Sequence, residues 1–364
     1  MRRAHGRVVE VDTLEEFDRR IAAGARRLDG WRICGVDLTG REEVLAGCSV
    51  GEALFLGCEM AEGLESLLRA DGAIVMHDVP DIPVDPYRLG LYSPADLYDT
   101  RDYATSFDAR AYAWSQGLHD SRSDQDRTLA QAMHDHSVDR SLTSWVAGRS
   151  LVGVMGGHAL ERGSGEYAAA ARLGHQLADH HTVATGGGPG AMEAANLGAF
   201  LSARPLPQLD NALGQLATVP SFVPDVGAWA DVALEVVDAV GDAGVDTLGV
   251  PTWHYGHEPP NPFATTIAKY FANAVREAIL LQVCDAGIVF LPGAGGTVQE
   301  IFQDACENYY SDPSSVATMV LVGVDYWTRE VPAWPLLTAL AAGRPMEGHV
   351  HLVDTVDEAA ELFA

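Results

Sequence analysis

From Leu151 onward, short apolar and β-branched runs alternate along the chain with longer stretches of helical periodicity. The runs that predict strands cover residues 151–155, 182–185, 247–250, 287–291 and 318–323. The stretches that predict helices lie near residues 165–179, 190–202, 228–240, 264–282 and 297–309. Nearly continuous apolar strands are typical of a parallel sheet buried on both faces, and their alternation with helices indicates an α/β fold. We therefore predict a Rossmann-like, doubly wound parallel sheet that binds ligands at the carboxyl ends of its strands.

The N-terminal third of the chain has a different pattern. Strands are predicted over residues 31–38, 52–57 and 72–77, and the proline-rich passage DVPDIPVDPYRLGLY after them cannot form a regular helix. A helix is predicted from about residue 124 to residue 147. We assign residues 1–125 to an N-terminal α+β region of unknown role and residues 126–364 to a Rossmann-like nucleotide-binding domain, with no internal repeat. A second proline-rich stretch, residues 203–224, fits either an insertion over the ligand end of the sheet or a surface loop.

The charge of the chain narrows the choice of partners. Its 364 residues carry a formal net charge of −27, which would repel a polyphosphate backbone, so we expect no nucleic-acid polymer as partner. A small anion can still bind where local donors outweigh this field. No apolar run approaches the ~18 residues that span a bilayer. The five cysteines form no CxxC pair. We expect a cytoplasmic protein with reduced thiols and no membrane partner.

Lysine is nearly absent from this sequence. Lys269 is the single lysine of the chain, and arginine carries the remaining positive charge. A phosphate-binding Walker A loop needs Gly-Lys-Ser/Thr, which does not occur, and a pyridoxal Schiff base would have to form on Lys269. The sequence therefore argues against both of these cofactor chemistries.

Glycine-rich turns follow three of the predicted strands. The first is ATGGGPGAMEAAN, in which Gly186, Gly187, Gly188 and Gly190 precede a predicted helix. Glycines let backbone N–H groups turn toward an anion, and a helix N-terminus adds partial positive charge. The same glycines also fit a tight turn that binds nothing. After strand 151–155, Gly156 and Gly157 permit close approach of a ligand to the backbone, although they match a dinucleotide fingerprint only weakly.

The third turn, FLPGAGGTVQE, places Gly293, Gly295, Gly296 and Thr297 just ahead of another predicted helix. Two such helix N-termini at one edge of a sheet would form a phosphate cradle without lysine. Thr297 and Glu300 also fit the T-x-x-E capping box, in which each side chain satisfies a backbone N–H of the other residue. Spacing alone favours this capping role for Glu300.

Between these turns, the helix predicted over residues 264–282 would carry Lys269, Asn273 and Arg276 on one stripe. This stripe fits either a positively charged face that binds the same anion as the glycine turns or an ordinary solvated face. His134, Asp135 and His136 resemble a metal-binding pair, but a helix would put the two histidines on different faces, so we predict no metal site. Trp253, Tyr255 and Phe263 are candidates to stack on a nucleobase.

Together, GGGPGAMEAAN and PGAGGTVQE resemble the LOG family, often labelled lysine decarboxylase-like and described as nucleoside 5′-monophosphate phosphoribohydrolases. The resemblance covers roughly residues 151–323, and residues before it look like the N-terminal extension of a longer form. It implies that Gly186 to Gly190 and Gly295 to Thr297 hold the 5′-phosphate, that Glu300 is the catalytic carboxylate and that Arg276 is its partner. It also implies a homodimer or larger homo-oligomer. Ala294 stands where the family pattern has a glycine.

The sequence thus supports a leading hypothesis and two alternatives. The first is hydrolysis of the N-glycosidic bond of a nucleoside 5′-monophosphate to free base and ribose 5-phosphate, without metal or organic cofactor. A carboxylate suits this reaction because it can stabilise an oxocarbenium-like centre and orient or deprotonate water. The second is a non-catalytic sensor that binds the nucleotide, and the third is a nicotinamide dehydrogenase. The base itself cannot be read from the sequence.

Overall fold

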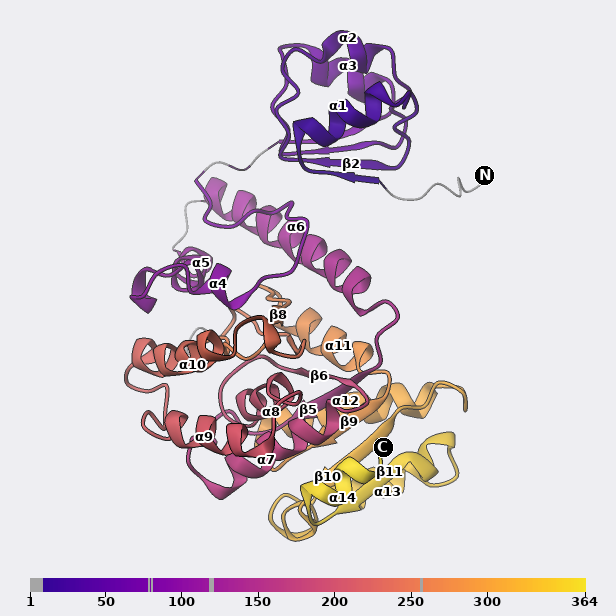
Figure 1. The fold of residues 1–364 in the computed structure, drawn as a ribbon. Helices are drawn as coiled ribbons and strands as arrows, with labels where there is room; N and C mark the ends of the chain where they lie inside the picture. The colour runs from indigo at the N-terminus through magenta and orange to yellow at the C-terminus, as the bar shows by residue number, and fades with distance from the viewer. Residues whose placement is uncertain (1–8, 78, 80, 118–120, 256–257) are drawn as a thin grey trace. The chain divides into compact units, whose positions relative to one another are not determined.

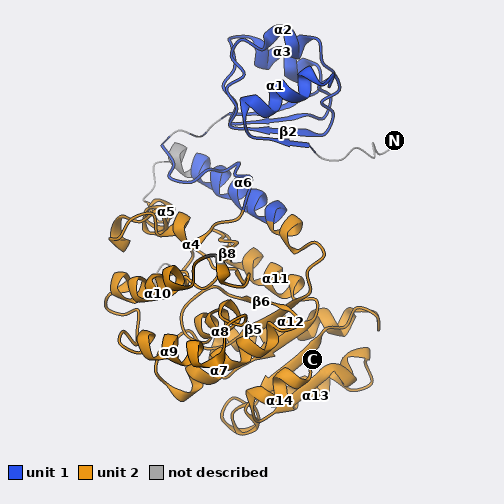
Figure 2. Cartoon of the chain, in the orientation of Figure 1, with its two compact units in different colours: residues 1–90, 118–141 blue, residues 91–117, 142–364 orange. Residues whose placement is uncertain are grey.

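The computed structural model describes residues 9–364 except residues 78, 80, 118–120 and 256–257 (Figure 1). The chain divides into two compact units, each built from two segments (Figure 2). Unit 1 comprises Met1–Gly90 and Leu118–Ser141, and unit 2 comprises Leu91–Gly117 and Leu142–Ala364. The chain therefore passes from unit 1 into unit 2 and back again, so the units do not meet at a single boundary near residue 125.

The sheet of unit 2 is parallel throughout and has the strand order β11-β10-β9-β5-β6-β7-β8 (Figure 1). Its strands are β5 (Leu151–Met155), β6 (Thr182–Thr185), β7 (Leu248–Gly249), β8 (Thr266–Ile267), β9 (Gly287–Phe290), β10 (Thr318–Val322) and β11 (Val350–Val353). The chain starts in the middle at β5, builds outward to β8, and returns to add β9, β10 and β11 on the other side of β5. This doubly wound order confirms the predicted α/β, Rossmann-like fold.

Helices cover both faces of this sheet. The helices of unit 2 are α4 (Pro94–Leu97), α5 (Phe107–Ser115), α7 (Gly165–Leu177), α8 (Ala191–Phe200), α9 (Leu206–Leu216), α10 (Val226–Val240), α11 (Asn273–Val283), α12 (Gly295–Tyr310), α13 (Ala333–Ala341) and α14 (Val356–Glu361). Helix α7 packs on α8 and α14, while α12 packs on α11 and α13. Short helical turns occur at Tyr103–Thr105, Gly241–Ala243, Tyr326–Glu330 and Pro345–His349. The proline-rich stretch 203–224 contains helix α9, which buries Leu209 and Leu216.

The core of unit 2 lies between β5, β6, β9 and the pair α7–α8. Val152, Val154 and Val289 of the strands are fully buried and belong to one apolar cluster with both helices. The two helices approach so closely that a Cβ added to Gly174 would lie 2.0 Å from the Ala195 carbonyl oxygen. Larger residues at this crossing would force the helices apart, so the contact fixes where α8 begins relative to the sheet.

The predicted helix over residues 264–282 is wrong in its first half. Helix α11 begins at Asn273, and residues 266–267 form the edge strand β8 instead. Ile267 exchanges backbone hydrogen bonds of 2.7 and 2.9 Å with Tyr92, and Ala268 N–H donates to the Gly249 carbonyl over 2.9 Å. These tertiary hydrogen bonds outweigh the helical periodicity of the segment. Lys269 therefore does not share a helix face with Asn273 and Arg276.

Unit 1 contains a second, smaller parallel sheet with the strand order β1-β2-β3-β4. Its elements are β1 (Val9–Val11), α1 (Leu14–Ala22), β2 (Trp31–Cys34), α2 (Glu42–Ala46), β3 (Leu54–Leu56), α3 (Leu64–Ala70), β4 (Ile74–Met76) and the part of α6 (Ser121–Val146) up to residue 141. Val9 pairs with Trp31, Arg32 with Leu54, and Leu54 with Ile74, so paired positions lie 22, 22 and 20 residues apart. This regular spacing contradicts the prediction that the chain has no internal repeat, because each strand–helix step adds to the same sheet.

All five cysteines carry free thiols. In the described part of the chain, none of the helices combines the length and the apolar character needed to cross a bilayer.

Candidate functional site

A cavity of about 640 Å³ opens at the carboxyl ends of the unit 2 strands. The strand order reverses between β5 and β9, and the loops after these two strands supply Gly156, Gly157 and Gly293 to the cavity wall. Its wall is formed by Met155, Gly156, Gly157, His158, Ala159, Leu160, Gly186, Gly188, Met192, Pro251, Thr252, Tyr255, Glu258, Arg276, Glu277, Pro292, Gly293, Ala294, Gly296, Thr297, Glu300 and Tyr326. The point of reversal is where doubly wound sheets bind ligands, and the volume suits a mononucleotide.

The N-terminus of α12 faces this cavity with an open first turn. Its N-cap residue, Ala294, provides no side-chain hydrogen bond to the helix. A Cβ added to Gly295 or Gly296 would meet no atom within 4 Å, so the backbone here is accessible to a ligand. Gly296 and Thr297 line the cavity, whereas Gly295 does not. Uncapped N–H groups at the start of a 16-residue helix can donate to an anion such as a phosphate.

The predicted capping box of Thr297 and Glu300 is wrong. Helix α12 begins at Gly295, two residues before Thr297, so both side chains lie within the helix. Glu300 is therefore not engaged at the helix start and belongs to the cavity wall one turn after Gly296.

Ala294 adopts a negative φ of −89°, so this position does not need the left-handed backbone that favours glycine. The departure from the glycine of the LOG pattern therefore does not place an L-residue at a positive φ. Gly293 beside it does need to be small, because a Cβ there would lie 2.2 Å from the Thr297 hydroxyl oxygen. Tyr326 also steadies this turn by donating its hydroxyl to the Gly293 carbonyl over 2.9 Å.

The first glycine turn divides into positions that line the cavity and positions that serve packing. Gly186 and Gly188 line the cavity, but Gly187 and Gly190 do not. Gly187 has φ +72°, and a Cβ there would lie 2.7 Å from the Pro251 ring. Gly190 has φ +73°, and a Cβ there would lie 2.4 Å from the Gly157 carbonyl oxygen. Both glycines allow close backbone packing that places the other two.

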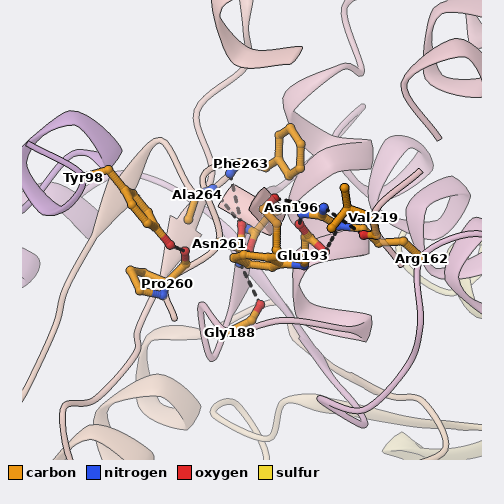
Figure 3. Close-up of polar contacts among 11 residues, drawn as sticks. Tyr98, Arg162, Gly188, Glu193, Asn196, Val219, Pro260, Asn261, Phe263 and Ala264 are labelled. Carbon is orange, nitrogen blue, oxygen red and sulfur yellow. Dashed lines mark hydrogen bonds and ion pairs between the residues drawn. The ribbon is translucent and has the colours of Figure 1, made fainter. Parts of the chain in front are cut away.

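Three buried polar side chains, Thr185, Asn196 and Asn261, hold this turn in place (Figure 3 shows the two asparagines). Asn261 donates to the Gly188 carbonyl and to the Asn196 side-chain oxygen, each over 3.1 Å, and its own side-chain oxygen accepts from the N–H groups of Phe263 and Ala264. The Thr185 hydroxyl accepts from Gly187 N–H over 2.9 Å and donates to Asn196 over 2.7 Å. A fully satisfied buried network of this kind makes the turn rigid.

A buried ion pair lies at the first turn of α8. Arg162 contacts Glu193 through two nitrogens, and its guanidinium also donates to the Val219 and Trp229 carbonyls (Figure 3). The guanidinium lies 4.5 Å from the centre of the Trp229 ring. Glu193 is fully buried, so these contacts satisfy a charge that burial would otherwise make costly. No local sequence pattern predicts this pair or the asparagine network, although Glu193 and Asn196 lie inside the motif GGGPGAMEAAN.

Arg276 lies in the first turn of α11 and is only 8% exposed. One terminal nitrogen donates to the Asn273 side-chain oxygen over 2.8 Å and lies 3.4 Å from Glu277. The other terminal nitrogen lies 3.7 Å from the position of a Cβ on Gly186, so the guanidinium faces the first glycine turn. Among the residues that the structure describes, its buried Nε atom has no hydrogen-bond partner. Asn273 does not line the cavity and instead positions Arg276.

Glu300 shares the cavity with Arg276. Burial raises the pKa of the Glu300 carboxyl to about 7, while Arg276 opposes the shift and the carboxylates of Glu277 and Glu258 add to it. Glu277 accepts from Asn273 over 2.8 Å and from Gln299, the neighbour of Glu300, over 2.6 Å. The site thus joins a titratable carboxyl near neutrality to one guanidinium and an open helix N-terminus.

Of the three aromatic residues proposed to stack on a base, the structure places one at the cavity. Tyr255 is 41% exposed and lines the wall, whereas Trp253 and Phe263 are buried in the core. The prediction for Trp253 and Phe263 is therefore wrong. Trp253 instead donates its indole N–H to Asp108 over 2.8 Å, which ties the loop after β7 to helix α5.

Lys269 is buried beside this contact and is not part of a phosphate-binding stripe. Its ammonium lies 2.5 Å from Asp108 and 5.2 Å from the centre of the Trp253 ring. Tyr103 donates its hydroxyl to the second oxygen of Asp108 over 2.9 Å. We call Tyr103, Asp108, Trp253 and Lys269 the buried clip, because they fasten residues 91–117 to the segment that follows β7.

Within the described residues, no group of three or more histidine, cysteine, aspartate or glutamate side chains could hold a metal ion. His134 is fully buried and pairs with Asp135 over 3.1 Å, and burial lowers the pKa of its imidazole.

The structure is that of a doubly wound α/β protein with a cavity at its point of strand reversal. No protein-family model matches the chain, and no curated protein matches it. Similar solved structures include two of the molybdenum cofactor carrier protein from Chlamydomonas reinhardtii, at 19% and 20% identity and TM-scores of 0.35 and 0.36. Each covers 58% of this chain and 94% of its own. A molybdenum cofactor binding protein from the phototrophic bacterium Rippkaea orientalis shows 16% identity, a TM-score of 0.35, and coverage of 59% and 94%. Likeness at this level carries no argument about function.

Proposed function

We propose that this protein hydrolyses the N-glycosidic bond of a nucleoside 5′-monophosphate, releasing free base and ribose 5-phosphate. The observation that carries the proposal is the meeting of Glu300, Arg276 and the open N-terminus of α12 in one cavity. The resemblance of the two glycine turns to the LOG family supports the same reading.

In the proposed complex, the 5′-phosphate binds the first turn of α12, where Gly296 and Thr297 line the cavity. Arg276 adds a charged donor from the first turn of α11, where its guanidinium faces the first glycine turn. Glu300 lies one turn along α12 from the phosphate, within reach of the ribose. Its carboxylate stabilises positive charge as the bond from C1′ to the base breaks, and takes a proton from the attacking water.

The alternative is a nucleotide-binding sensor without turnover, which rests on Ala294 and on the long N-terminal region, and the negative φ of Ala294 weakens the first of these two motives. Incubation with AMP, GMP, CMP, UMP and IMP separates the two functions. Free base on chromatography supports the hydrolase, whereas a raised melting temperature without any base supports the sensor.

The replacement Arg276→Ala should weaken monophosphate affinity by about 10- to 100-fold, since a hydrogen bond to a charged group contributes about 1.5–3 kcal/mol. Isothermal titration with the preferred monophosphate measures this loss. Arg329→Ala is the matched control, because Arg329 is exposed and pairs with Asp325 outside the cavity. Equal affinity of wild type and Arg276→Ala would remove Arg276 from the site.

The rate of base release should depend on the ionisation of Glu300. Because the carboxylate is the active form and its pKa is raised to about 7, kcat/KM falls about tenfold per pH unit below that value. Glu277→Gln removes a like charge and should move this decline to lower pH. Glu361→Gln, at an exposed position on α14, should leave the profile in place. An acid limb centred near the ordinary glutamate pKa in wild type would contradict this role.

We further propose that the protein forms a homo-oligomer, as the family resemblance implies. We also propose a cytoplasmic location, because all five cysteines carry free thiols.

A further inference from the structure

We propose that His158, held by Glu258, is the general acid that protonates the departing base. This inference rests on the proposed function and adds a second catalytic residue to it. Neither residue belongs to the two glycine turns that carry the family resemblance.

His158 lies on the loop after β5, on the wall of the same cavity as Glu300 and Arg276. Its side chain is 49% exposed, so a ligand in the cavity can reach the imidazole. Its backbone is fixed, because Ala191 N–H donates to the Gly157 carbonyl over 3.1 Å and a Cβ on Gly190 would lie 2.7 Å from the His158 carbonyl oxygen. The start of α8 thus fixes the position of the histidine.

Glu258 approaches the imidazole from the segment after β7, with its carboxylate 3.5 Å from His158 Nδ1. A carboxylate at this distance can orient the imidazole ring through its Nδ1 atom. The other charged residues that line the two pockets sharing His158 are Glu161, Arg162, Glu193, Arg276, Glu277 and Glu300. Arg162 and Glu193 neutralise each other, and Glu277 accepts from Asn273 and Gln299. Of these charged residues, Glu258 is the one placed 3.5 Å from the imidazole.

The reaction needs two proton-handling groups. When the C1′–N bond breaks, its electron pair goes to the base, and a neutral nucleobase leaves poorly as an anion. The His158 imidazolium gives its proton to a ring nitrogen of the base as the bond breaks. Glu300 takes a proton from the water whose oxygen bonds to C1′. One water is consumed, base and ribose 5-phosphate form, and proton exchange with solvent restores both side chains.

A cationic base provides the direct test, because it leaves as a neutral molecule without a proton. The comparison uses GMP and AMP beside N7-methylguanosine 5′-monophosphate and nicotinamide mononucleotide. His158→Gln should slow base release from the neutral-base nucleotides by about 100-fold and leave release from the cationic ones nearly unchanged. Glu300→Gln should slow both classes alike, and thermal denaturation confirms that both variants fold.

The pH dependence of kcat/KM for wild type and His158→Gln gives a second test, which needs no cationic substrate. Wild-type kcat/KM should fall at alkaline pH as His158 loses its proton, and the variant should lack this decline. Equal losses for both nucleotide classes, no loss for either, or an alkaline decline that persists in the variant would overturn the role of His158. Absence of base release by wild type from every nucleotide would instead refute the proposed function.

Discussion

Glu300→Gln should fold, bind nucleoside monophosphates and lose base release by about 10²- to 10⁴-fold, the usual contribution of a positioned general base. Glutamine keeps the size of the side chain on α12, but it can neither carry the negative charge nor accept the proton of water. Because burial raises the pKa of Glu300 to about 7, half of the wild-type carboxyl is ionised near neutral pH, and the variant loses this fraction altogether.

The matched control for this variant is Glu307→Gln, on the same helix but outside the cavity wall. It should keep wild-type turnover, so a loss confined to Glu300→Gln cannot come from a change in helix charge. Binding is followed by the shift in melting temperature with a monophosphate. If Glu300→Gln releases base at the wild-type rate, the carboxylate has no chemical role.

Lys269→Met should destabilise unit 2 by about 3–5 kcal/mol, the effect of leaving a buried charge without its partner. Lys269 and Asp108 are 1% and 2% exposed, and the ion pair between them is 2.5 Å long. Removing the ammonium leaves the Asp108 carboxylate with the indole N–H of Trp253 and the hydroxyl of Tyr103 as donors. Urea denaturation, with the midpoint and slope recorded for each transition, measures the loss.

Two further variants define the cause of this loss. The double variant Lys269→Met with Asp108→Asn removes both charges and should recover part of the stability. Arg110→Ala breaks an exposed pair with Asp99 in the same segment and should cost less than about 1 kcal/mol. A change for Lys269→Met as small as that for Arg110→Ala would show that the buried clip does not stabilise the unit.

The regular part of the fold could be predicted from local pattern. Strands such as β5 and β9 are short apolar runs buried on both faces, and helices such as α7 have apolar residues at helical spacing. The local sequence pattern is therefore enough to predict these elements. The edge strand β8 could not be predicted in this way, because its extended backbone depends on hydrogen bonds to Tyr92, far away in sequence. The strand β1 was missed because its residues Val-Glu-Val do not form a continuous apolar run, unlike the equally short β3 and β4.

The candidate site likewise contains residues that local sequence predicts and residues that only distant contacts reveal. Sequence motifs predicted Glu300, Arg276, Gly186, Gly188 and Gly296, which line the cavity, because glycine turns before helices have a clear local signature. They did not reveal that Gly187 and Gly190 are needed for close packing, since this depends on Pro251 and Gly157 from other loops. Asn261 and the His158–Glu258 pair act across segments 70 or more residues apart, and no local pattern marks such contacts.

The most direct test of the central claim is a product balance for the wild-type protein with its best nucleoside monophosphate. Free base and ribose 5-phosphate are quantified together with inorganic phosphate. The account predicts base and ribose 5-phosphate in equal amounts, with no phosphate released and no product from Glu300→Gln. Nucleoside and phosphate as products, or no product from any monophosphate, would contradict it.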